Sequence, residues 1–186
     1  MRTLRVILPA TLLLGLAGCG YNTIQTYDEQ VNAAGSQIKV QLQRRADLIP
    51  NLVETVKGYA RHEETIFTDV ANARARLAGA VQTGNLREMA DANTALTAPL
   101  GRLLAIAENY PQLKSNENFR ALQDELTGTE NRIAVSRQDY NDAVSRYNAY
   151  IRRFPQVITA KMTGAKAREY FQLQTAGADT VPKVKL

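Results

Sequence analysis

The feature that most constrains the fold is a seven-residue apolar repeat that recurs along most of the chain. Between residues 38 and 80 the repeat holds for about six heptads, with Arg45 and Glu63 as its polar exceptions. Side chains seven residues apart share one stripe of a helix, whereas a strand would alternate every two residues. Because no segment shows that alternation, the sequence predicts an all-α protein.

The repeat predicts three long helices. The first continues to about residue 80 and has Pro50 inside it. The heptad phase passes through Pro50 unbroken, which favours one long kinked helix. The alternative places Pro50 in the first turn of a separate helix, where proline is well tolerated. The second helix is expected from about Asn85 to Asn109, with a kink at Pro99.

The third long helix shows the most regular pattern. Its apolar and aromatic residues follow a strict seven-residue spacing from Phe119 to Phe154, and Pro155 is expected to stop it. Short helical pieces are predicted near residues 156–162 and 165–171. Three long antiparallel helices joined by short loops make an elongated up-and-down helical bundle. We therefore assign 1–18 to a signal peptide, 19–171 to the bundle and 172–186 to a frayed tail.

The first eighteen residues have the pattern of a secretory signal. Arg2 and Arg5 precede a run of twelve mostly apolar residues, which is shorter than the about 20 needed to span a bilayer as helix. The run ends in Leu16-Ala17-Gly18-Cys19, which resembles a bacterial lipobox cleaved between Gly18 and Cys19. Cys19 is the single cysteine of the chain. The alternative is a core cysteine in an ordinary secreted protein.

A lipobox predicts a mature chain that begins at a lipidated Cys19 and is held in a membrane of the cell envelope. Two or three acyl chains give near-permanent anchoring. Gly20, rather than aspartate, follows Cys19, which favours the outer membrane in a bacterium that has one. Loss of Arg2 and Arg5 lowers the formal charge from +5 to +3. So small a charge, together with secretion, argues against a nucleic-acid partner.

Polar side chains occur where a helical bundle would normally place apolar ones. A stripe of the third predicted helix combines them with Ala134, Val144 and Ile151, and possible partners on the first helix include Arg45. Three interpretations are open. The polar residues could form a buried network that binds a ligand or switches conformation, or a buried layer that fixes the register of the helices. They could also lie at the solvent-exposed edge of the helices. The candidate residues for this polar layer are Asp47, Asn51, Glu54, Glu63, Glu130, Arg137, Asn141 and Asn148.

The sequence contains no recognisable catalytic or cofactor motif. His62 is the single histidine, so a His-Glu-x-x-His metal site cannot form, and Glu63 and Glu64 point apart on a helix. Phosphate-binding glycine loops and the Gly-x-Ser-x-Gly elbow are also absent from the sequence. We therefore predict no catalytic residue, no metal and no cofactor.

Several segments resemble the LemA family. The resemblance covers about Tyr21 to Phe171, and it is carried by RADLIPNLVETVKGYA at residues 45–60 with His62-Glu63, NFRALQ at 118–123, and GTENRIAV at 128–135. It implies an antiparallel helical bundle attached to a bacterial membrane, with no established enzymatic activity. Many such proteins have an N-terminal transmembrane helix, whereas this chain has a lipobox. The resemblance assigns no role to the polar residues.

The sequence combines a lipid anchor and a long helical bundle with no recognisable catalytic motif. Together these features predict a non-enzymatic interaction or scaffold protein with an unidentified envelope partner. The main alternative is a lipid- or envelope-stress-related binding module whose kinked helices, at Pro50 and Pro99, contact membrane. A third possibility is an enzyme that uses the polar layer, which would require Glu63, Glu130 and Arg137 to share a water-accessible pocket.

Overall fold

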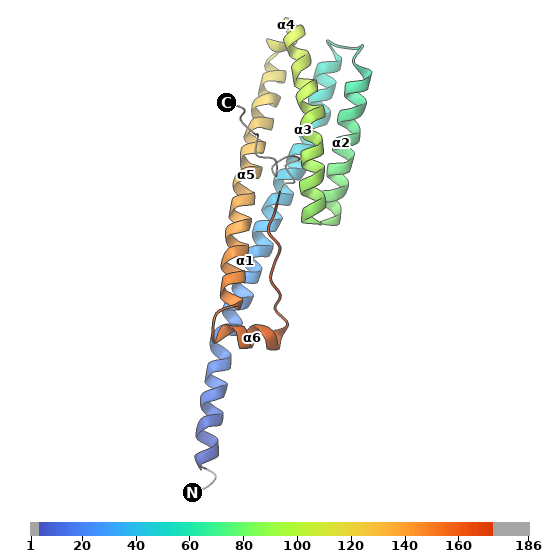
Figure 1. Ribbon diagram of the computed structural model, residues 1–186. Helices are drawn as coiled ribbons and strands as arrows, with labels where there is room; N and C mark the ends of the chain where they lie inside the picture. Colours follow the sequence, from blue (N-terminus) through green and yellow to red (C-terminus); the bar gives the residue numbers. More distant parts are fainter. Residues whose placement is uncertain (1–3, 173–186) are drawn as a thin grey trace, which may run out of the picture. The chain divides into compact units, whose positions relative to one another are not determined.

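The computed structural model describes residues 4–172, with side chains from residue 20 onward, and this part of the chain is helical without any strand (Figure 1). The all-α prediction is therefore confirmed. The six helices are α1 (Leu4–Lys57), α2 (Glu64–Thr83), α3 (Leu86–Asn109), α4 (Pro111–Lys114), α5 (Glu117–Ile151) and α6 (Gln156–Thr163). The predicted tail lies almost wholly outside the described residues.

The described residues divide into two compact units. The N-terminal unit holds residues 4–36 and 136–170, which include the first part of α1, the last part of α5, and α6. The bundle unit holds residues 37–135 and 171–172, in which parts of α1 and α5 pack with α2 and α3. The core of the bundle unit is apolar, with Ile49, Leu77, Leu96 and Leu103 fully buried.

Helix α1 runs continuously through Pro50, as the unbroken heptad phase predicted. It ends at Lys57, however, so the expectation of a single helix to about residue 80 was wrong. Gly58 follows, and the amides of Tyr59 and Ala60 both donate to the carbonyl of Val56, 3.0 Å away in each case. Glycine is a poor helix former, and these bonds close a turn that leads into α2.

The heptad pattern did not reveal this turn because the spacing of buried residues is the same on both sides of it. Val56 and Val70 lie fourteen residues apart in the sequence, and both are fully buried. Periodicity reports which positions are buried, but it does not report the direction of the chain between them. Tyr59, which the pattern placed in the core, lies in the turn and is exposed.

A short connection reverses the chain between α2 and α3. Gly84 caps α2 with φ 73°, a left-handed conformation that glycine adopts without steric cost, and its amide donates to Ala80. Asn85 caps α3, since its side-chain oxygen accepts from the amides of Arg87 and Glu88 at 3.0 and 3.3 Å. The boundaries predicted for the second helix, Asn85 to Asn109, are confirmed.

Helix α5 begins and ends close to the predicted residues. The side-chain oxygen of Asn116 accepts from the Phe119 amide at 3.0 Å, which caps the first turn. Leu126, Ile133 and Tyr140 are buried along the predicted stripe. Phe154 was expected to continue that stripe, but it is 81% exposed because α5 has already ended at Ile151.

The segment after α5 contains one short helix where two were predicted. Helix α6 confirms the first, and Gly164, with φ 72°, ends it. The second, near residues 165–171, does not form; residues 165–172 have no regular secondary structure. Side chains of α1 and α5 hold residues 168 and 169 instead, as described below.

Candidate functional site

The structure distributes the predicted polar residues over different surroundings. Asp47, Asn51, Glu54 and Glu130 are exposed in the bundle unit, and Glu63 is half-buried at the N-cap of α2 without a side-chain capping bond. Arg137 and Asn141 are half-buried on α5 in the N-terminal unit, where Asn148 alone of the set is buried. The eight residues therefore do not form one buried layer.

One buried polar contact of the bundle unit involves Arg45, a charged exception in the heptad pattern. Its Nη1 donates to Oδ1 of Asn93 on α3 at 2.7 Å, and both side chains are buried. Burial lowers the pKa of Arg45, while the negative charge of Glu130 acts in the opposite direction. Since arginine stays protonated at physiological pH, Arg45 is a buried positive charge that depends on Asn93 as its hydrogen-bond acceptor.

In the N-terminal unit, Asn148 holds the irregular segment after α6 against α5. Its Nδ2 donates to the Arg168 carbonyl at 2.9 Å, and its Oδ1 accepts from the Arg168 amide at 2.8 Å. The Tyr140 hydroxyl donates to the Glu169 carbonyl at 3.0 Å. These bonds satisfy backbone groups that no helix pairs, so the segment has one defined path.

An ion pair adds α1 to this arrangement. The guanidinium of Arg168 donates from Nε and Nη2 to Oδ1 of Asp28 at 3.0 and 2.8 Å, and Nη2 also reaches Oδ2 at 3.0 Å. Both side chains are partly exposed, so the pair orients the segment more than it stabilises the fold. We call residues 164–170 with their partners Asp28, Tyr140 and Asn148 the strap.

The strap predicts an alkaline limit to stability. Burial raises the pKa of Tyr140 above its ordinary value near 10, while the charge of Arg168 opposes this shift and Glu169 adds to it. Above about pH 10 the unfolded chain loses this phenol proton while the folded chain keeps it, so stability falls as pH rises. Urea unfolding between about pH 8 and pH 11 should show a shallower fall for Tyr140→Phe than for the unsubstituted chain. Equal slopes would contradict this role of Tyr140.

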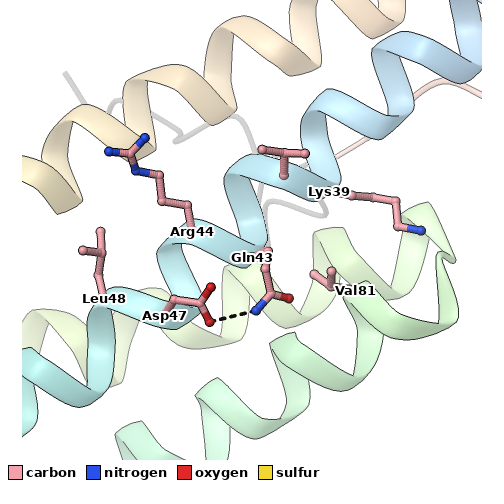
Figure 2. A pocket seen from close by; sticks show the side chains of 7 residues that line it. Lys39, Gln43, Arg44, Asp47, Leu48 and Val81 are labelled. Carbon is pink, nitrogen blue, oxygen red and sulfur yellow. Dashed lines mark hydrogen bonds between the residues drawn. The ribbon is translucent and has the colours of Figure 1, made fainter.

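A hollow of about 460 Å³ lies on the bundle unit, and it is the candidate site (Figure 2). It includes Asp47 of the predicted set. Val40, Arg44 and Leu48 follow one another at four-residue intervals on α1, so they share a face away from the heptad seam. The full lining is Lys39, Val40, Gln43, Arg44, Asp47, Leu48 and Val81.

Three of the polar side chains around this hollow have partners. Nε2 of Gln43 donates to Oδ1 of Asp47 at 2.8 Å, as Figure 2 shows. Nη2 of Arg44 lies 2.7 Å from Oε1 of Glu125, which Arg132 also contacts at 2.9 Å. Lys39 extends toward the end of α2, where a Cβ on Gly84 would lie 3.1 Å from its Nζ. The result is an apolar surface between charged groups.

Such an arrangement suits the docking of an apolar side chain. Neither this hollow nor the second one described, beside the strap, is lined by Glu63, Glu130 or Arg137. Within residues 20–172, no group of three or more His, Cys, Asp or Glu side chains could hold a metal ion. Sequence reasoning overlooked Val40 and Leu48, although apolar residues outside the heptad seam were a usable signal.

Comparison with known proteins assigns the chain to a family. A model of the LemA family matches residues 34–186. The chain belongs to the LemA family. Because the match begins at residue 34, the first part of α1 precedes the region that the family model covers. The resemblance drawn from residues 45–60 and 118–135 is thereby confirmed.

Three LemA-type relatives are magnetosome proteins. Magnetosome proteins MamQ 1 and MamQ 2 of Paramagnetospirillum magneticum strain AMB-1 are each 32% identical over 191 residues, covering 90% of this chain and 68% of theirs. MamQ of Magnetospirillum gryphiswaldense is 29% identical over 180 residues, covering 84% of this chain and 66% of its own.

Among the residues of this chain with described side chains, no helix is both long and apolar enough to span a membrane.

Proposed function

We propose that this LemA-family chain is a lipid-anchored, non-enzymatic interaction protein of the bacterial cell envelope. The observation that carries the proposal is the position of Cys19, the single cysteine, directly after Leu16-Ala17-Gly18. The MamQ relatives support association with a membrane. Gly20 after Cys19 favours the outer membrane in a host that has one, and the bundle would then face the periplasm or the exterior.

The anchor is tested by mass spectrometry of protein taken from membranes of the native host. We expect a mature N-terminus at Cys19 that carries a diacylglyceryl thioether, and no peptide from residues 1–18. An unmodified Cys19 thiol in that preparation would overturn the anchor. The measurement depends on no knowledge of a partner.

In this proposal, an envelope protein partner binds at the hollow on α1. Val40 is 56% exposed there, and an apolar side chain from a partner could cover it together with Leu48 and Val81. Polar and charged neighbours such as Lys39 and Asp47 would fix the orientation of the partner. No step of chemistry is required of these residues.

We expect a photocrosslinking amino acid at Val40 to capture a reproducible envelope protein in intact cells. Val135 provides a matched control, because it is also valine, 59% exposed and in the bundle unit, but outside the hollow. Capture at Val40 and not at Val135 would support the docking surface. The same products at both positions, or none at Val40, would count against it.

Membrane contact through the proline-containing helices α1 and α3 is the alternative function. Pro50 and Pro99 both lie inside continuous helices. Binding of liposomes by a soluble form without Cys19 would favour this alternative, and its absence would leave the anchor as the membrane attachment.

A further inference from the structure

The N-terminal unit exposes apolar side chains on and beside α6. Phe154, in the turn before this helix, is 81% exposed, and Ile158 and Met162 within it are 52% and 79% exposed. Ile158 and Met162 are four residues apart and therefore share a face, while Ala160 is buried on another. Three large apolar groups left to water within nine residues indicate a surface that has an apolar partner.

The segment that carries this apolar surface is also basic. Residues 143–168 contain six lysines and arginines and no aspartate or glutamate. The mature chain from Cys19 has a formal charge of +3, so the rest of it carries −3. Arg152, Arg153 and Lys161 are all exposed. Apolar side chains combined with exposed basic ones match the surface of a membrane that contains anionic lipid.

The residue that follows the proposed lipid anchor packs against the same helix. A Cβ on Gly20 would lie 3.4 Å from Cγ of Gln156 and 3.6 Å from Oγ1 of Thr159, so the residue after Cys19 packs directly against α6. Figure 1 shows α6 running across the end of α5, next to this part of α1. Tyr21, exposed on the same stretch, is a residue type enriched at membrane interfaces.

We propose that α6 lies on the membrane surface, with Phe154, Ile158 and Met162 at the boundary of headgroups and acyl chains. Arg152, Arg153 and Lys161 contact anionic headgroups. The inference rests on the proposed anchor, because lipidated Cys19 holds α6 at the bilayer and makes its contact intramolecular. A short helix then needs little affinity of its own to remain there.

The test uses lipidated full-length mature protein in vesicles of phosphatidylethanolamine and phosphatidylglycerol. Met162→Cys introduces one reactive thiol, because Cys19 is a thioether, and a polarity-sensitive fluorophore is attached to it. We expect blue-shifted emission and quenching by aqueous iodide reduced about fivefold relative to detergent-solubilised protein. Val135→Cys is the matched control, for which emission and quenching should not change.

Charge-reversal variants test the basic residues separately. Arg152→Glu with Lys161→Glu should restore most of the iodide quenching at position 162, and vesicles of zwitterionic lipid alone should do the same. Arg76→Glu with Arg120→Glu, two exposed arginines of the bundle unit, should not. If neither the Arg152→Glu, Lys161→Glu pair nor the removal of anionic lipid changed the iodide quenching at position 162, the role given to the basic residues would be overturned.

The outcomes separate this inference from the anchor on which it rests. Equal quenching of position 162 in vesicles and in detergent, with Cys19 unreactive, would overturn the placement of α6 and leave the anchor intact. Labelling of Cys19 in the unsubstituted chain would overturn the anchor and this placement together.

Discussion

Asn93→Leu is expected to lower the free energy of unfolding by about 3 kcal/mol, because it removes the side-chain acceptor of a buried guanidinium. Arg45 donates to Asn93 over 2.7 Å, and neither side chain has appreciable contact with water. Leucine has the same number and branching of side-chain heavy atoms as asparagine but offers no oxygen, so the substitution leaves the Arg45 guanidinium without this acceptor. Urea denaturation followed by circular dichroism gives the change.

The double variant Arg45→Met with Asn93→Leu is the control for this prediction. It removes both polar groups, and we expect it to recover stability to within about 1 kcal/mol of the original chain. A double variant as unstable as Asn93→Leu alone would mean that the loss came from packing. Retention of full stability by Asn93→Leu would contradict the dependence of Arg45 on this acceptor.

Asn148→Leu is expected to release the strap from α5. The substitution removes two part-buried hydrogen bonds to the backbone of Arg168. Each such bond contributes up to about 1.5 kcal/mol, so we expect the free energy of opening the strap to fall by about 2 to 3 kcal/mol. Hydrogen exchange of the Arg168 amide should accelerate by roughly 30- to 150-fold, since about 1.4 kcal/mol corresponds to tenfold. Amides of α2 and α3 should keep their exchange rates.

Asn131→Leu is the matched control on the same helix, because Asn131 is exposed and surface substitutions usually change stability by less than about 0.5 kcal/mol. Unchanged exchange at Arg168 in Asn148→Leu would show that the Asp28–Arg168 ion pair and Tyr140 hold the strap without Asn148. Faster exchange throughout the chain would instead mark Asn148 as a residue of global stability.

Helix boundaries could be predicted where a local signal sets them. Asn85 and Asn116 cap their helices with their own side chains, and Pro155 follows soon after the end of α5. Each effect acts within about one helical turn, so neighbouring residues suffice to predict it. The turn at Gly58 also has a local signal, but the heptad spacing on either side of it obscured the change of direction.

The candidate site was much less predictable. Asp47 and Asn148 were both selected as polar residues near a seam, yet one lines an open hollow and the other is buried against the strap. A stripe beside a heptad seam lies at the edge of the helix face. Whether a residue on that edge is buried depends on what the rest of the chain packs there.

The sequence by itself determined that the protein is helical, that it resembles the LemA family, and which residues of the regular heptad stripes, such as Ile49 and Ile133, are buried. The lipobox at Cys19 remains a prediction. Only the tertiary structure decided which polar groups are buried and what they contact. Asn93 lies 48 residues from Arg45, and Arg168 lies 20 residues from Asn148. Periodicity and capping act over a few residues, whereas the partner of a buried polar group is fixed by packing between distant segments.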